Sequence, residues 1–143
     1  MAEFTYNPVQ EVADGQAAIL LDSIPCSKGY VVHRNESGLV ILRGIVNNPC
    51  STFARYQVTA VGNIAVPTGG TVEEISVALA IDGEPIQTSR SRVTPAAVED
   101  YFNVTSTALV TVPKGCCFTV TLENTSGQAI NIQNLNVVVQ RIA

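Results

Sequence analysis

The side chains that could carry out chemistry in this sequence are few and scattered. A Ser-His-Asp hydrolase needs a histidine as its base, and His33 is the only histidine among the 143 residues. It stands in the apolar stretch of residues 30–34, close to a turn, where an ordinary strand is expected. We therefore interpret His33 as a satisfied or exposed strand residue rather than as a general base.

Carboxylate pairs would indicate glycosidase chemistry, which needs two acids facing each other across a cleft. The twelve acids stand mostly alone, and the exceptions are the adjacent pairs Glu73-Glu74 and Glu99-Asp100. Neighbouring residues in a strand point to opposite faces, so neither pair is expected to act as a dyad. Gly69-Gly70 lacks the lysine and the following helix of a phosphate-binding loop. We predict no catalytic residue, no cofactor and no enzymatic activity.

Four cysteines, Cys26, Cys50, Cys116 and Cys117, allow more than one interpretation. Their spacing matches no zinc motif, and a single histidine adds little as a fourth ligand, so no metal site is predicted. The first residues lack the basic and apolar regions of a signal peptide, which favours reduced thiols in the core. A disulfide or intersubunit bridge formed after release, or a bound metal, are the alternatives.

Charged residues make up only 14% of the chain, against about 25% in typical soluble domains. The net charge is −4, and no cluster of Lys and Arg indicates binding to nucleic acid. Apolar runs are far shorter than the roughly 20 residues of a membrane-spanning helix, so no membrane partner is predicted. With a mean hydropathy of +0.25, the exterior is expected to be partly covered by other subunits. A compact, mildly adhesive monomer is the alternative.

The elements that must position these residues are predicted to be strands. Val, Ile and Thr supply 20, 11 and 13 residues, and β-branched side chains pack well on sheets. Apolar and polar residues alternate over residues 56–66, 75–81, 102–112, 118–122 and 135–140, which predicts half-buried strands. Asp82-Gly83 predicts a two-residue type I′ hairpin, and residues 95–99 are the only helical candidate, about one turn long.

These signals predict an all-β fold, an antiparallel jelly roll or β-sandwich of about eight to ten strands in a single domain. Residues 15–143 would form the jelly roll, and residues 1–14 an N-terminal arm or an edge strand. On the last strand, Asn134, Asn136 and Gln140 alternate with apolar residues and lie near Val138. Amides can hydrogen-bond across an interface without the desolvation cost of a charge. We predict that these four residues contact another subunit, with a merely polar face as the alternative.

The second half of the chain resembles tumour-necrosis-factor-like jelly rolls. The resemblance rests on the Asp82-Gly83-Glu84-Pro85-Ile86 hairpin, on Val112-Pro113-Lys114-Gly115 before the strand at residues 118–122, and on Asn124-Thr125-Ser126 before the last strand. It is greatest for jelly rolls of bacterial spore-surface collagen-like proteins and related phage proteins. The front half, at residues 44–70, is similar to small proteins encoded beside capsid genes of Firmicutes phages. No collagen-like Gly-X-Y segment is present, which favours an independent component of a virion.

The resemblance implies a homotrimeric phage decoration protein bound to the major capsid protein. Such a protein is made in the cytoplasm of the bacterial host and resides on the capsid surface of the virion. The N-terminal arm, through Phe4, Tyr6 and Pro8, would then reach the capsid or a neighbouring subunit.

A carbohydrate- or receptor-binding module displayed on a particle surface, with a surface glycan as partner, is the rival hypothesis. Such a module favours exposed aromatic residues near loop tips, and Tyr30 and Tyr101 are the best candidates. A cupin-like enzyme would need a histidine cluster, which this sequence does not contain.

Overall fold

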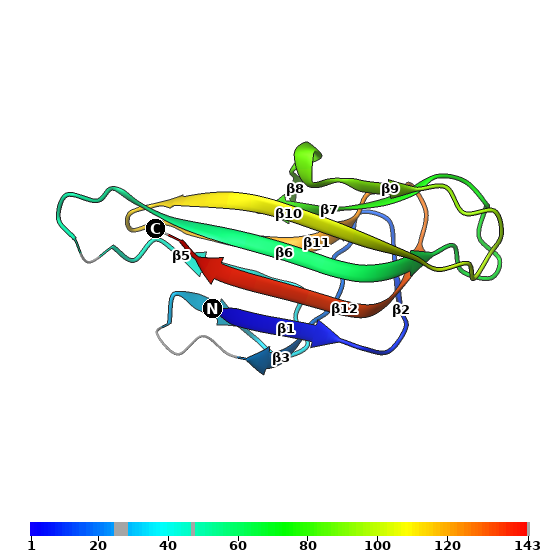
Figure 1. Cartoon of the computed structure of the whole chain (residues 1–143), viewed down its shortest axis with the longest axis horizontal. Helices are drawn as coiled ribbons and strands as arrows, with labels where there is room; N and C mark the ends of the chain where they lie inside the picture. Colours follow the sequence, from blue (N-terminus) through cyan, green and yellow to red (C-terminus); the bar gives the residue numbers. More distant parts are fainter. Residues whose placement is uncertain (25–28, 47, 143) are drawn as a thin grey trace.

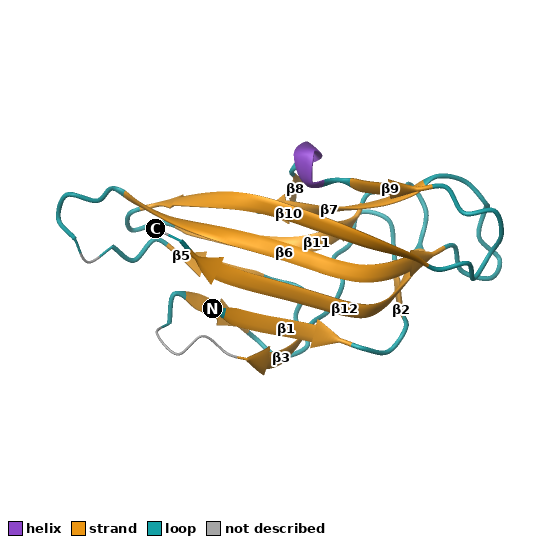
Figure 2. Ribbon diagram, viewed as in Figure 1, coloured by secondary structure: helices purple, strands orange, loops and turns teal. Residues whose placement is uncertain are grey.

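The chain forms two antiparallel β-sheets, seen in Figures 1 and 2. This computed structural model describes residues 1–24, 29–46 and 48–142. The first sheet has the order β10-β6-β12-β1-β3, with β2 also paired to β12. Its strands are β1 (Ala2–Tyr6), β2 (Gln10–Val12), β3 (Leu21–Ile24), β6 (Phe53–Ala65), β10 (Phe102–Pro113) and β12 (Ile130–Arg141). The second sheet has the order β4-β5-β11-β7-β8, with β9 paired to β7. Its strands are β4 (Val31–His33), β5 (Val40–Arg43), β7 (Ile75–Ile81), β8 (Glu84–Pro85), β9 (Ser91–Val93) and β11 (Cys117–Asn124).

Consecutive long strands lie in opposite sheets, since the chain passes from β5 to β6 to β7 and later from β10 to β11 to β12. This connectivity gives a jelly-roll β-sandwich, and the predicted fold class is confirmed. The number of strands exceeds the predicted eight to ten. Several strands have only two to four residues, and such strands are too short to show an alternation of apolar and polar residues in the sequence.

Helical structure is confined to one short 3₁₀ turn, η1 (Gln87–Ser89), among the described residues. The helical turn expected at residues 95–99 does not form, and that segment is a bend and turn between β9 and β10. The positive φ of Glu99, at 57°, lies outside the right-handed helical region, so a helical turn cannot include this residue. The described part of the chain has no helix that is long and apolar enough to cross a bilayer.

The core lies between the two sheets and takes one side of each long strand. Along β6, Tyr56, Val58 and Ile64 are fully buried, as the alternation predicts. The hydroxyl of Tyr56 donates a hydrogen bond of 2.6 Å to the carbonyl oxygen of Arg43, so the buried phenol is satisfied. Strand β7 differs from the predicted half-buried pattern, because six of its seven residues are buried. Its outward side is covered in part by Arg90, whose Nε donates to the hydroxyl of Ser76.

Residues 2–6 form an internal strand rather than an arm or an edge strand. Strand β1 pairs with β12 from Ala2↔Val139 to Tyr6↔Leu135, and on its other side it pairs with β3. Strand β2 pairs with the beginning of β12. The first residues therefore belong to the sandwich itself, because backbone hydrogen bonds to β12 and β3 hold β1 on both edges.

The Asp82-Gly83 turn joins β7 to β8 as predicted. The φ angles of Asp82 and Gly83 are 50° and 84°, both positive, as a type I′ turn requires. The carboxylate of Asp82 accepts hydrogen bonds of 2.9 Å from the amide and from the hydroxyl of Thr119. These bonds favour the charged form, so they hold the pKa of Asp82 below its usual value. The turn is thereby fastened to the neighbouring strand β11.

Candidate functional site

The outward side of the first sheet, over β1, β6, β10 and β12, has no covering layer among the described residues. We call it the outer face. The long strands β6, β10 and β12 and the shorter β1 display it. The alternation that places the valines of these strands in the core places their other side chains outside. The outer face consists of Glu3, Thr5, Arg55, Gln57, Thr59, Val61, Asn63, Asn103, Thr105, Thr107, Leu109, Thr111, Gln133, Asn136, Val138 and Gln140.

Charge is almost absent from the outer face. It carries one acid, Glu3, and one base, Arg55, and the other side chains are neutral. Apolar side chains stand among the amides and hydroxyls: Leu109 is 61% exposed, while Val61 and Val138 are half-buried. A sheet face washed by solvent usually carries Lys and Glu, which keep proteins apart in solution. The composition of the outer face instead matches the charge-depleted centre of a protein interface.

The four residues predicted to form an interface lie on this surface or at its edge. Asn136, Val138 and Gln140 belong to the outer face on β12. Asn134 is exposed at a bulge of the same strand, where the pairing with β6 shifts between Gln133 and Asn136 and its φ is 53°. The structure therefore brings the four residues together with side chains of β6 and β10 that the sequence reasoning did not include.

A row of asparagines crosses the outer face, each on a different segment: Asn103 on β10, Asn63 on β6, Asn134 on β12 and Asn7 after β1. The side-chain amide of Asn103 donates to Asn63 at 3.2 Å, and that of Asn63 donates to Asn134 at 3.2 Å. Asn134 in turn donates to Asn7 at 2.5 Å. We call these four residues the asparagine row. The individual asparagines gave no sign of it, because only the strand register aligns them.

The three residues predicted to reach a capsid have different environments. The ring of Phe4 is 2% exposed and its centroid lies 4.6 Å from that of His33, so Phe4 is a core residue. Tyr6 is half-buried against the core, and Pro8 is exposed in the turn before β2. Phe4 is therefore not available for an external contact, because its strand pairs on both edges and turns this side chain inward.

His33 is a satisfied structural residue, which agrees with its interpretation from the sequence. Its side chain is 1% exposed, with Nδ1 2.6 Å from a carboxylate oxygen of Asp22 and Nε2 2.8 Å from the carbonyl oxygen of Ser37. Asp22 lies on β3 of the first sheet and His33 on β4 of the second. The pair therefore links the two sheets along one side of the sandwich.

The acid pairs lie in loops and not in strands, which corrects the sequence-based placement. Glu73-Glu74 belongs to the connection from β6 to β7, and Glu99-Asp100 to that from β9 to β10. The carboxylate of Glu99 accepts hydrogen bonds from the amide and the hydroxyl of Thr68, at 3.0 and 3.2 Å. The nearby Tyr101 donates to the other oxygen of Glu99, and burial raises the pKa of Tyr101. Glu99 thus ties two loops together at one end of the sandwich.

The cysteine prediction needs a correction, since Cys50, Cys116 and Cys117 are exposed free thiols and not core residues. Cys26 lies outside the described residues. Backbone hydrogen bonds from Gly44 to Cys116, at 2.8 Å, and from Gly115 to Gly44, at 3.0 Å, hold the turn that carries Cys116 at the end of the sandwich. Residues at such a tip extend beyond the facing sheet, so the apolar character of a thiol does not lead to burial there.

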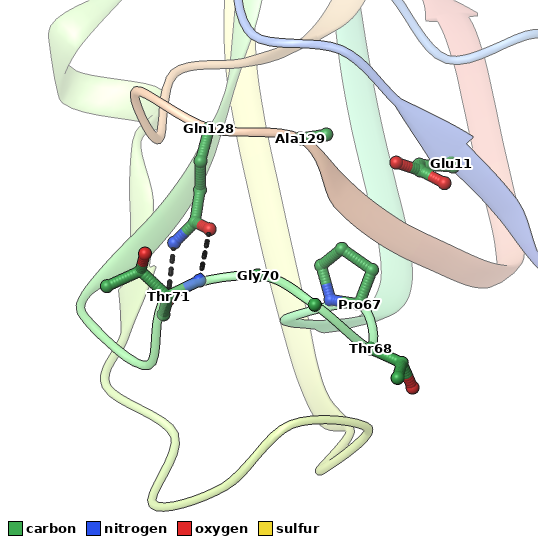
Figure 3. A pocket seen from close by; sticks show the side chains of 8 residues that line it. Glu11, Pro67, Thr68, Gly70, Thr71, Gln128 and Ala129 are labelled. Carbon is green, nitrogen blue, oxygen red and sulfur yellow. Dashed lines mark hydrogen bonds between the residues drawn. The ribbon is translucent and has the colours of Figure 1, made fainter.

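A polar pocket lies where the β6–β7 connection meets the segment before β12, shown in Figure 3. Its volume is about 350 Å³, and Glu11, Thr68, Thr71 and Gln128 are among the lining residues. The side chain of Gln128 accepts a hydrogen bond from the amide of Thr71 and donates one to its carbonyl oxygen, at 3.0 and 2.7 Å. This pair of bonds fixes one wall, and the exposed carboxylate of Glu11, on β2, stands on the other side.

The aromatic candidates for glycan contact are not freely exposed. Tyr30 is half-buried, packs against the core and lies under the guanidinium of Arg141, whose central carbon is 4.3 Å from the ring centroid. Tyr101 is also half-buried and bonds to Glu99. Neither tyrosine lines the polar pocket.

The comparisons with known proteins show that this chain is similar to solved structures in fold alone. No protein-family model matches the chain, and no curated protein matches it. Among solved structures, the chain is similar to the globular domain of zebrafish complement 1qA protein, with a TM-score of 0.48, 8% identity and 96% of each chain covered. It is also similar to the C-terminal domain of EclA, a sugar-binding protein, with a TM-score of 0.42, 14% identity, and 93% and 80% of the two chains covered. A family 35 carbohydrate binding module from an environmental isolate matches with a TM-score of 0.37 and 12% identity over 100% and 98% of the two chains.

Proposed function

We propose that this chain is a non-enzymatic structural protein that works as a homotrimer, with the outer face buried between protomers. The observation that carries the proposal is the composition of that face, where sixteen side chains include one acid and one base. Leu109, which is 61% exposed on the edge strand β10, would lose this contact with water on association. The removal of apolar surface from water makes the main favourable contribution to the free energy of protein association.

The dimensions of the outer face are compatible with a stable interface. Strands β6, β10 and β12 alone, spaced about 4.8 Å apart and displayed over roughly 40 Å of their length, present on the order of 600 Å² before side-chain relief is counted. One partner in a stable complex contributes about 800 Å². Neutral amides and hydroxyls can be desolvated and paired across an interface at lower cost than charges. The outer face therefore has both the size and the chemistry for a lasting contact.

The particle to which the trimer belongs is, in this proposal, a phage virion. The resemblance of residues 75–142 to trimeric jelly rolls of phage proteins, and of residues 44–70 to small proteins encoded beside capsid genes, supports it. The trimer would be made in the cytoplasm of the bacterial host and would bind the major capsid protein on the capsid surface. Contacts that exist only in the assembled state would stabilise the shell by mass action. Phe4, Tyr6 and Pro8 are the residues that the sequence predicted to contact the capsid, and of these three only Pro8 is exposed.

The native mass of the purified chain tests the proposal. Light scattering after size exclusion, in the presence of reductant, should give three times the chain mass of 15.1 kDa. The reductant is needed because the exposed thiols of Cys50, Cys116 and Cys117 could otherwise link copies covalently. A mass of 15.1 kDa at every concentration tested would contradict the proposal.

Binding of a neutral glycan is the second candidate function, and the polar pocket favours it. A volume of about 350 Å³ lies within the range of small-ligand sites. Its wall includes the fixed amide of Gln128 and the exposed carboxylate of Glu11, and a carboxylate accepts hydrogen bonds strongly from sugar hydroxyls. This function would suit a module displayed on a particle surface.

Replacement of Glu11 by glutamine tests the glycan hypothesis. A panel of neutral hexose and N-acetylhexosamine oligosaccharides would be titrated by calorimetry against the parent chain. Loss of a charge-assisted hydrogen bond should weaken the binding by about tenfold or more in Glu11→Gln. Glu84→Gln, at an exposed glutamate on β8 outside the pocket, is the matched control and should bind like the parent. Equal affinities of Glu11→Gln and the parent, or no binding at millimolar concentration, would contradict this function.

A further inference from the structure

The three hydrogen bonds of the asparagine row all run in one direction. Nδ2 donates to Oδ1 from Asn103 to Asn63, from Asn63 to Asn134 and from Asn134 to Asn7. A primary amide has two N–H groups, and the row uses one from each donor. The second N–H of Asn103, Asn63 and Asn134 therefore remains for a partner outside the row. A protein that covers the outer face must either meet these donors with acceptors or leave them unsatisfied.

The backbone of β12 is irregular at Asn134, the third member of the row. The register between β12 and β6 shifts between Gln133 and Asn136, and Asn134 adopts a left-handed φ of 53°. Asparagine tolerates this conformation better than most residues. The bulge places the amide of Asn134 between those of Asn63 and Asn7, which lie on different segments. Beside it lies a depression of about 260 Å³, bordered by Thr5, Leu135 and Asn136 as well as by two members of the row, Asn7 and Asn134.

Five other side chains of the outer face make fewer demands on a partner than the asparagine row does. The hydroxyls of Thr59 and Thr107 bond to each other at 3.2 Å, and Val61, Leu109 and Val138 are apolar. Apolar contacts are non-directional, so a partner can slide over these side chains at little cost. A shifted partner would nevertheless bury the donors of the asparagine row without acceptors, and unsatisfied buried polar groups are costly.

We propose that the asparagine row selects the register and the number of copies in the homo-oligomer, while the apolar side chains supply the affinity. This inference rests on the proposed self-association. The occupant of the outer face is a second copy of the chain, because its one acid and one base make the face complementary in charge to a protomer of the same sequence. A single buried asparagine fixes register and oligomeric state in coiled coils by the same physical effect.

Replacement of Asn63 by valine tests the role of the row. Asn63 is the second member, and its loss removes two of the three bonds. Valine favours strands, so the fold should persist; Asn103→Val, at the exposed end of the row, repeats the test from β10. Native mass spectrometry should show that Asn63→Val still associates but populates more than one stoichiometry. The excess of the parent's species over its competitors should fall by about fivefold, as the loss of a satisfied hydrogen bond implies.

Thr59→Val is the matched control, because it lies on the same strand and face and also replaces a hydrogen-bonding side chain by valine. It should keep the single stoichiometry of the parent. If Asn63→Val and Asn103→Val keep that same single stoichiometry, or become monomeric while the parent assembles, the row does not select copy number and the inference is overturned. A parent chain that is itself monomeric overturns the proposed self-association first, which separates the two failures.

Discussion

Replacement of Phe4 by alanine is expected to lower the free energy of unfolding by about 3–5 kcal/mol. The ring is 2% exposed and contacts the ring of His33, with 4.6 Å between centroids. Truncation would leave a cavity between the sheets beside the pair formed by His33 and Asp22, which links them. Urea denaturation followed by circular dichroism measures the change.

Pro8→Ala is the control for this variant, since Pro8 is exposed in the turn that follows β1. It should change the free energy of unfolding by no more than about 0.5 kcal/mol. The comparison of Phe4→Ala with Pro8→Ala shows whether residues 2–6 form a strand of the sandwich or a detached arm in solution. If Phe4→Ala were as stable as the parent, residues 2–6 would be an arm in solution, and the pairing of β1 with β12 and β3 would not hold there.

Replacement of Leu109 by lysine is expected to dissociate the oligomer while the protomer keeps its stability. Leu109 is 61% exposed on the outer face, so lysine costs the isolated protomer about 0.5 kcal/mol or less. Within the assembly, the ammonium group would be desolvated without a nearby opposite charge, since Glu3 is the only acid of the outer face. The dissociation constant should rise by at least about 100-fold. Light scattering across a dilution series measures it.

Leu39→Lys provides the matched control, because Leu39 is a comparably exposed leucine, at 48%, beside β5 of the second sheet. It should leave both the native mass and the free energy of unfolding close to those of the parent. An unchanged mass of Leu109→Lys would show that the outer face is not the interface. Loss of assembly in Leu39→Lys alone would instead assign the interface to the second sheet.

Local sequence patterns were sufficient for the long strands β6, β10 and β12 and for their buried sides. Val104, Val110 and Val112 on β10, and Leu135, Val137 and Val139 on β12, are buried as the alternation predicts. The Asp82-Gly83 turn has the predicted positive φ angles. These features depend on side-chain direction and on backbone preferences within a few residues, and both follow directly from residue type. Strand lengths and turn spacing are also set by residues close together in the chain, so the sequence could predict a jelly-roll β-sandwich.

The candidate site depended on pairings between distant residues. The segment with Phe4 and Tyr6 has the same local pattern in an arm and in a strand, and only its pairing with residues 135–139 distinguishes them. The polar pocket joins Glu11 of β2 to Thr68 and Gln128 of two other segments. Cys116 and Cys117 are exposed because they lie at or beside a turn at the end of the sandwich, although their residue type favours burial.

The sequence by itself therefore determined the fold class, the alternation of β6, β10 and β12, and the scarcity of charge on the exterior. Only the tertiary structure decided that the uncharged side chains of β6, β10 and β12 form one continuous face, and that four asparagines align across it. The physical reason is strand register: a shift of one residue would turn each of these side chains to the opposite face. Register depends on pairing between strands distant in the chain and on the bulge at Asn134, and the residue pattern within any one strand does not specify either.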